Sequence, residues 1–242
     1  MRHVTQKLAA EVADYPWYHT LELGDGIVTA GMFDHRPVLR HYPLPEDLTG
    51  LRCADIGTMD GFWAFEMERR GASEVVAVDA PGPLTLDWPA SLRHTAEKSL
   101  DETKEERFAL AHRALDSKVR RVACTVYDID AEQLGTFDIV FCGDLLVHLR
   151  DPVGALERIH AVTSGSAIVT NPIERFGLRD RLPLARLDGI DEFGWWHSNM
   201  AGLVRMVRAC GFQRVEESRA FKLPFATGGR WKGLRGVVRA YP

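Results

Sequence analysis

The stretch from Leu51 to Ala80, LRCADIGTMDGFWAFEMERRGASEVVAVDA, constrains the fold of this chain more than any other. It holds an apolar run, a glycine turn, large apolar residues at helical spacing, and a second apolar run that ends at Asp79. Strand, helix and strand in that order predict two parallel strands joined by a crossover helix. Such a unit is half of a nucleotide-binding α/β fold, which binds its ligand at the carboxyl ends of the strands.

The glycine turn, residues 57–61, differs from the turn that dinucleotide-binding folds use. Those folds carry Gly-x-Gly-x-x-Gly, in which the middle glycine lets the backbone approach a pyrophosphate. Here Met59 blocks that approach, and Asp60 adds a negative charge. The spacing therefore disfavours NAD and FAD, whereas Asp55 and Asp60 suit a ligand that carries an ammonium and a sulfonium group.

The pattern Asp55-x-Gly57-x-x-x-Gly61 resembles the first motif of the class I S-adenosylmethionine (SAM) methyltransferases. In that family an acid ends the first strand, and the turn passes beneath the sulfonium ligand. The resemblance implies SAM as the methyl donor, S-adenosylhomocysteine (SAH) as the product, and Thr58 as a further contact in the turn. Asp79 follows the turn by about 20 residues, where a carboxylate accepts both ribose hydroxyls.

Two later apolar runs extend the resemblance. Residues 121–127 predict a third strand, and the family carries an acid after it that hydrogen-bonds the adenine amino group, which implies Asp128 with Ile129 beside it. Residues 137–143 are nearly all apolar, as expected for a strand that helices cover on both faces. Gly143 ends this strand and joins the implied cofactor contacts.

Further runs predict a doubly wound sheet of seven strands. The resemblance implies that this sheet is mostly parallel, with the Rossmann-like methyltransferase fold, and that its last strand is antiparallel. The remaining strands and helices are expected over residues 165–170, 213–221 and 236–241, and over residues 152–162 and 200–210. Residues 1–48 are predicted to form an N-terminal attachment over the cofactor cleft, with a helix over residues 4–14 and a hairpin around residues 24–26. Residues 49–242 are the expected SAM-binding domain.

The chain has 242 residues and no Pro/Gly/Ser-rich linker, which favours one sizeable core. No window approaches the roughly 18 uninterrupted apolar residues of a membrane span, and the first residues lack the apolar core of a signal peptide. The four cysteines have no C-x-x-C spacing, which disfavours zinc and disulfides. We expect a soluble, cytoplasmic protein without membrane contact or metal, whose oligomeric state the sequence leaves open.

The formal net charge of −4 disfavours nucleic acid as the main partner. The charge is uneven, because nine Lys and Arg residues follow residue 200, against two Glu residues. This basic part is either a solvated face or a rim that attracts an anionic substrate, so nucleic acid stays a possible but unfavoured partner.

Several segments, WYHTLELGDGIVTAG, FCGDLLVHLRDPVGALERI and WWHSNMAGLVRMVRACGF among them, resemble the methyltransferases related to the bacterial enzyme that completes 5-oxyacetate on tRNA wobble uridine. That enzyme uses a carboxylated SAM, which a tyrosine before the histidine of its strand-four loop helps to bind. Here Val147 precedes His148, and a valine cannot donate a hydrogen bond to a carboxylate. We therefore expect ordinary SAM.

Methyl transfer from a sulfonium is an in-line displacement, so the protein must exclude water, align the acceptor and remove the proton of a hydroxyl acceptor. His148 is the first candidate for this base, and a purely structural role for it stays open. His19 and His197 compete for the same role. Asp144 is expected to orient a base or to help hold a divalent ion.

Aromatic side chains and one late connection are the candidate acceptor contacts. Trp17, Trp63 and Trp196 are expected to wall the pocket, although each suits simple packing as well. His197 and Asn199 stand in the long connection before the last helix, where this fold usually carries acceptor contacts.

The sequence thus predicts a SAM-dependent methyltransferase, most naturally an O-methyltransferase in the biosynthesis of a sugar or natural product, with a small-molecule acceptor. Two alternatives remain open: a tRNA wobble-uridine methyl- or carboxymethyltransferase, and a SAM-binding partner protein without catalysis. A hydride-transferring Rossmann enzyme is a more distant alternative.

Overall fold

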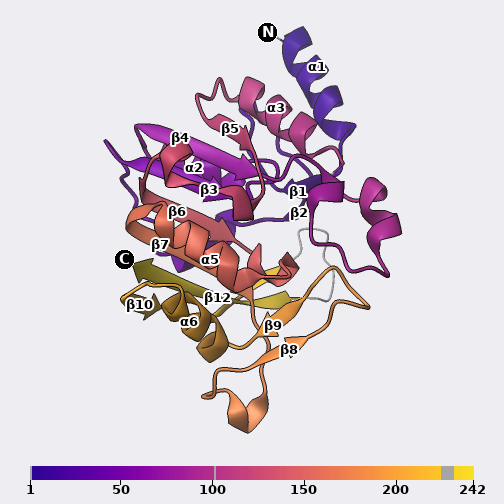
Figure 1. Ribbon diagram of the computed structural model, residues 1–242. Coiled ribbons are helices and arrows are strands. Elements are labelled where there is room, and N and C mark those ends of the chain that lie inside the picture. Colours follow the sequence, from indigo (N-terminus) through magenta and orange to yellow (C-terminus); the bar gives the residue numbers. More distant parts are fainter. Residues whose placement is uncertain (1, 101, 225–231) are drawn as a thin grey trace.

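The computed structural model describes residues 2–100, 102–224 and 232–242 (Figure 1). Its centre is an eight-stranded sheet with the strand order β10-β12-β7-β6-β3-β4-β5, and β11 pairs with β12 outside this path. The strands are β3 (Arg52–Ile56), β4 (Glu74–Asp79), β5 (Arg120–Ala123), β6 (Phe137–Gly143), β7 (Thr163–Pro172), β10 (Arg214–Glu217), β11 (Phe221–Pro224) and β12 (Lys232–Tyr241).

The sheet is parallel from β5 through β4, β3 and β6 to β7, and β12 joins it antiparallel to β7. This confirms the α/β class and the mostly parallel sheet, but the predicted number of seven strands is wrong. The single strand expected over residues 213–221 is divided into β10 and the start of β11. The division arises because β12 is long: β11 pairs with residues 232–235, and β10 with residues 238–241.

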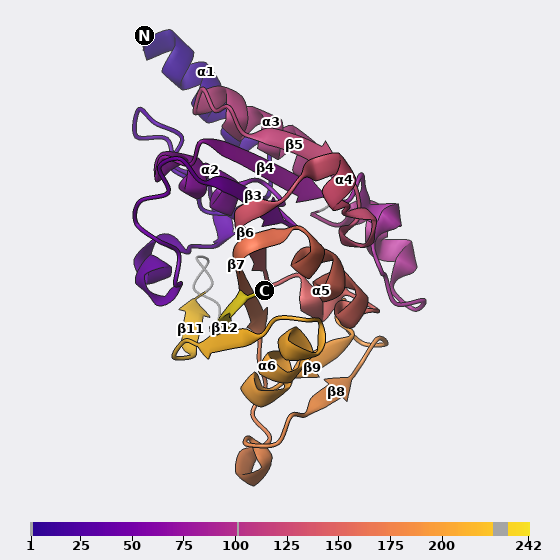
Figure 2. The ribbon, with the colours of Figure 1, turned by 60° about the vertical axis from the view of Figure 1, so that its left-hand side comes forward.

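Helices cover both faces of the sheet because its strands alternate their apolar side chains between the two sides. Cys53 and Val75 pack with α2 (Phe62–Arg69) and α3 (Lys104–Ala114), whereas Ala54 and Val76 belong to the other core cluster, with α5 (Pro152–Ala161) and α6 (Met200–Ala209). In Figure 2, α2 lies on one side of the sheet, and α5 and the short α4 (Ala131–Leu134) on the other.

The N-terminal segment packs into the same core cluster as α2. It contains α1 (Arg2–Ala13), β1 (Trp17–His19) and β2 (Gly31–Phe33). A bridge between Glu22 and Val28 forms the expected hairpin, but β1 and β2 themselves pair in parallel. Gly31 permits that pairing, because a Cβ atom there would lie 2.1 Å from the backbone carbon of His19.

Short elements complete the fold. The strands β8 (Ala185–Leu187) and β9 (Trp196–Ser198) form a separate antiparallel pair before α6. The 3-10 helices are η1 (Arg36–His41), η2 (Pro83–Thr85), η3 (Arg93–Lys98), η4 (Val126–Asp128), η5 (Leu146–His148) and η6 (Gly177–Arg179). Among the described residues, no helix has the length and apolar character that a bilayer crossing needs.

Candidate active site

A cavity of about 300 Å³ opens at the carboxyl ends of the central strands. The strand order reverses between β3 and β6, and doubly wound sheets bind ligands at such a reversal. The predicted site residues that line the cavity are His19, Gly57, Trp63, Asp79, Gly143, Asp144 and His148. Its lining is mainly apolar, with a few polar groups that converge on it, as is common in small-molecule sites.

Asp79 reaches the cavity from the end of β4. Its Oδ2 accepts a hydrogen bond from the backbone N–H of Met59 at 2.6 Å, and its Oδ1 lies 2.7 Å from Nζ of Lys104. The bond to Met59 ties the carboxylate to the glycine turn, so Asp79 and Gly57 face the same part of the cavity.

Asp55, Thr58 and Gly61 stabilise the glycine turn and are not among the residues that line the cavity in the described chain. The buried carboxylate of Asp55 accepts hydrogen bonds from Oγ1 of Thr58 at 2.7 Å and from the backbone N–H of Ala64 at 3.1 Å. Burial raises the pKa of Asp55 to about 7. Gly61 has a φ of +96°, and a Cβ atom there would lie 2.4 Å from the Phe65 ring.

Asp60 was predicted to place its charge beside the ligand, but it is not among the residues that line the cavity. Its carboxylate accepts hydrogen bonds from the backbone N–H groups of Tyr18 at 2.8 Å and His19 at 3.1 Å, and it bonds Nδ1 of His19. The glycine turn thereby holds β1 against the cavity.

Asp128 and Ile129, implied as adenine contacts, lie outside the lining as far as the chain is described. Asp128 is exposed and accepts a hydrogen bond from Oγ1 of Thr125 at 2.5 Å, while Ile129 is buried in the core. The segment curls into η4 after β5, which brings Thr125 and Tyr127 to the cavity and turns Asp128 outward.

His19, His35 and Trp63 line one end of the cavity, where the ring of His35 contacts the rings of the other two. The ring centroids of His19 and His35 are 5.4 Å apart, and those of His35 and Trp63 are 5.3 Å apart. Burial lowers the pKa of His35 well below its usual range, and the nearby charges of His19 and Arg235 lower it further. His35 is therefore neutral at physiological pH.

Asp144 lines the cavity beside Thr170, whose hydroxyl donates to it at 3.0 Å. Its other oxygen accepts a hydrogen bond from Nε of Arg235, and both side chains of this ion pair are buried or nearly so. The guanidinium of Arg235 therefore balances the negative charge of Asp144.

His148 lines the cavity beside Phe193. Its Nδ1 bonds the carbonyl oxygen of Phe193, whose ring stacks on Trp88 with centroids 4.0 Å apart. Trp88 and Phe193 line the cavity from two segments that are distant in the sequence.

The other predicted acceptor contacts have structural roles outside the described cavity lining. Trp17 is buried and donates to the carbonyl of Val12 at 2.8 Å, and Trp196 donates to the carbonyl of Arg150 at 3.1 Å. Asn199 caps α6 by accepting a hydrogen bond from the backbone N–H of Gly202 at 2.8 Å. These side chains are thus engaged by packing and capping.

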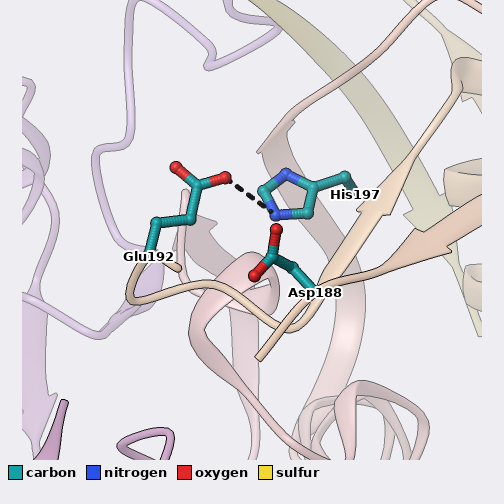
Figure 3. A group of neighbouring side chains, drawn as sticks. All are labelled: Asp188, Glu192 and His197. Atoms are coloured by element: carbon teal, nitrogen blue, oxygen red, sulfur yellow. Dashed lines mark ion pairs between the residues drawn. The ribbon is translucent and has the colours of Figure 1, made fainter. Parts of the chain in front are cut away.

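Figure 3 shows His197 with Asp188 and Glu192, whose potential ligand atoms lie within 4.8 Å of one another. Nε2 of His197 is 3.3 Å from Glu192, and Arg186 donates to Asp188 at 2.8 Å. These three residues are absent from the described cavity lining. Because a guanidinium already balances Asp188, we assign no metal ion to this cluster.

Sequence reasoning missed several lining residues, notably His35, Trp88 and Phe193, and it missed Lys104 as the partner of Asp79. No local motif marks these residues. Only His35 carried a usable signal, since it is a histidine within the segment predicted to cover the cleft.

No protein-family model matches the chain. The ubiquinone biosynthesis O-methyltransferase of Xanthomonas oryzae pv. oryzae is 31% identical over 110 residues. That alignment spans 46% of this chain and 37% of the relative, so the chain matches little more than a third of the relative's length.

Solved structures match over more of the chain. The N-terminal domain of EvdMO1 with SAH bound has a TM-score of 0.59 at 18% identity, and the match covers 100% of this chain and 97% of that one. The 1,6-didemethyltoxoflavin-N1-methyltransferase of Burkholderia thailandensis has a TM-score of 0.55 at 18% identity, with coverage of 80% and 71%. Magnesium protoporphyrin IX methyltransferase from Synechocystis PCC 6803 has a TM-score of 0.53 at 15% identity, with coverage of 80% and 75%.

At these identities the likeness establishes the fold. The narrower resemblance to the tRNA wobble-uridine enzymes stays a prediction. The chain has the Rossmann-like α/β fold of the class I SAM-dependent methyltransferases.

Proposed function

We propose that this protein is a SAM-dependent methyltransferase that methylates a hydroxyl group of a small polar acceptor, such as a sugar or another natural product. One observation carries the proposal: the carboxylate of Asp79 and the turn at Gly57 face the same cavity, at the strand-order reversal of a methyltransferase fold. A carboxylate in that position is suited to accept the two hydroxyls of a ribose.

Two observations support this cavity as the cofactor site: the residues that line it, and the solved structures of similar fold. Gly57, Asp79 and Gly143 are the proposed contacts from the motif, and Thr125 and Tyr127 take the place of Asp128 on the nucleoside side. EvdMO1 and the toxoflavin enzyme were both crystallised with SAH. When bound, SAM would supply the electrophilic methyl group.

The acceptor is assigned to the end of the cavity that His19, His35 and Asp144 line. These polar groups suit a hydroxylated ligand, and the walls of Met32 and Trp63 suit an apolar ring face. The sequence relative is named an O-methyltransferase, and EvdMO1 was also crystallised in the presence of SAH and D-fucose. Residues 1–48 supply much of this end, which supports their role as a cover over the cleft.

The decisive experiment is a calorimetric titration of the full chain with SAH, SAM, carboxylated SAM and NAD. We expect SAH and SAM to bind and NAD to fail. Preference for carboxylated SAM would favour the tRNA-modifying alternative, and binding of NAD alone would overturn the proposal.

Acceptor screening follows, with SAH release measured against panels of sugars and hydroxylated natural products. SAM binding without SAH release across broad panels would favour a non-catalytic partner protein instead. Strong, salt-sensitive tRNA binding would favour the wobble-uridine alternative.

A further inference from the structure

We propose that His19 and Asp60 form a proton-accepting pair, in which Asp60 of the glycine turn orients His19 as the base that deprotonates the acceptor. This inference rests on the proposed function and gives the base a definite identity. It also gives a second role to the turn, which would contact the methyl donor on one side and hold the base on the other.

The position of Asp60 is built by backbone as well as side-chain contacts. Its Oδ2 accepts from the backbone N–H groups of Tyr18 and His19 at 2.8 and 3.1 Å, and its Oδ1 bonds Nδ1 of His19. Nε of Arg107 lies 3.7 Å from Oδ2. The carboxylate is fully buried, so these contacts fix its orientation.

Asp60 is ionised in this setting. Burial alone would raise its pKa, but the charge and hydrogen bonds of His19 together with the charge of Arg107 outweigh that effect and lower the pKa below its usual value. An ionised carboxylate only accepts hydrogen bonds, so Nδ1 of His19 must carry the proton. When His19 is neutral, its lone pair therefore resides on Nε2, as a general base requires.

Nε2 of His19 is available to a ligand. His19 lines the cavity, and among the described residues no hydrogen bond to Nε2 is recorded. The neighbouring rings of Tyr18, His35 and Phe62 pack around the imidazole and restrict its rotation. The base is thus held in one orientation at the acceptor end.

The two other histidines of the cavity are less suited to this role. Nδ1 of His35 bonds the hydroxyl of Tyr42 at 2.8 Å, and its lowered pKa makes it a poor proton acceptor. Nδ1 of His148 bonds a neutral carbonyl oxygen, that of Phe193. A carboxylate stabilises the imidazolium that forms on proton transfer more strongly than a neutral oxygen does.

The proton and electron pairs balance in a single displacement. The acceptor oxygen forms its bond to the methyl carbon while the carbon–sulfur bond breaks and leaves its electrons on sulfur. The hydroxyl proton moves to Nε2 of His19, and Asp60 stabilises the resulting positive charge without taking the proton. The imidazolium then releases that proton to solvent.

The first test needs no acceptor. Long-range proton–nitrogen NMR of the full chain, labelled with ¹⁵N in histidine, reports the protonation state of each ring nitrogen. His19→Gln assigns the signals of His19. We expect wild-type His19 to carry its proton on Nδ1, and Asp60→Asn to shift it to Nε2, because the asparagine amide can donate to Nδ1. A neutral His19 with its proton on Nε2 in the wild type would overturn the pair, whether or not Asp60→Asn folds.

The second test measures turnover on the first acceptor identified. His19→Gln and Asp60→Asn should each lower kcat by about 10²- to 10⁴-fold, while calorimetric affinity for SAH changes little. The pH dependence of kcat in Asp60→Asn should shift, which a merely structural role would not cause. His160→Gln, in α5 and outside the described cavity lining, is the matched control and should keep wild-type turnover. Full activity of His19→Gln, with a large loss in His148→Gln, would assign the base to His148.

The proposed function and the His19–Asp60 pair can be disproved separately. If SAH does not bind the wild type, the proposed function is wrong, whatever the tautomer of His19. If SAH binds but His19 lacks the expected tautomer, only the pair is wrong.

Discussion

Nζ of Lys104 lies 2.7 Å from Oδ1 of Asp79, and both side chains are buried. The ammonium comes from the start of α3 and the carboxylate from the end of β4, two elements that η2 and η3 separate in the sequence. The pair holds Asp79 at the cavity wall with lone pairs left for a ligand, because each carboxylate oxygen offers about two.

Asp79→Ala should weaken SAH binding by about 1.5–3 kcal/mol, the worth of a hydrogen bond to a charged group. This loss corresponds to roughly a 10- to 150-fold rise in the dissociation constant, which calorimetry measures directly. The variant also leaves Lys104 without this partner, so the folded fraction must be checked by circular dichroism. A well-folded Asp79→Ala protein with unchanged SAH affinity would remove Asp79 from the cofactor site.

Asp128→Ala is the matched comparison, because Asp128 was implied as the adenine contact and yet lies outside the cavity lining. Its carboxylate is exposed and its recorded contact is the hydroxyl of Thr125. We expect SAH affinity to stay within about twofold of wild type, as for most exposed substitutions. A loss as large as that of Asp79→Ala would show that Asp128 turns inward when the cofactor binds.

Asp55 should make the stability of the protein depend on pH. Burial raises its pKa in the folded chain to about 7, whereas an unfolded Asp titrates near 4. A raised pKa means that the contribution of Asp55 to stability is complete below about pH 4 and is lost as the pH rises to about 7. Over that window the loss approaches about 1.4 kcal/mol per pH unit.

Asp55→Asn isolates this effect, because the amide oxygen can still accept from Thr58 and Ala64 but does not titrate. Urea unfolding of both proteins from pH 5 to pH 8 should show the variant gaining stability relative to wild type as the pH rises. A stability difference that stays constant across this range would mean that Asp55 is not protonated in the folded state.

The sheet was predictable from the sequence because its signals are local. Strands buried on both faces are continuous apolar runs, and α2 follows directly from the spacing of Phe62, Phe65 and neighbouring apolar residues. The extra strand was not predictable, because the break between β10 and β11 is set by their common partner β12. No feature of residues 213–221 alone marks it.

The cavity lining was predictable in part, from the motif and from candidate bases such as His19 and His148. Gly57 and Asp79 line the cavity, but Asp60 is turned backward by β1, about 40 residues earlier in the chain. Lys104 and Phe193 reach the site by tertiary packing from segments without a motif. Their roles depend on three-dimensional contacts that residue spacing does not encode.

The ion pair between Asp144 and Arg235 joins the end of β6 to β12 across the intervening β7. Removing one partner leaves a buried charge, which costs about 3–5 kcal/mol. Arg235→Met and Asp144→Asn should therefore each lower the free energy of unfolding, and the double variant should lose less than the sum of the two. Arg186→Met is the control, since its ion pairs are more exposed and should contribute little to stability. Urea unfolding at pH 7 distinguishes the cases: equal losses in Arg235→Met and Arg186→Met would mean that water screens the Asp144 pair as it does a surface pair.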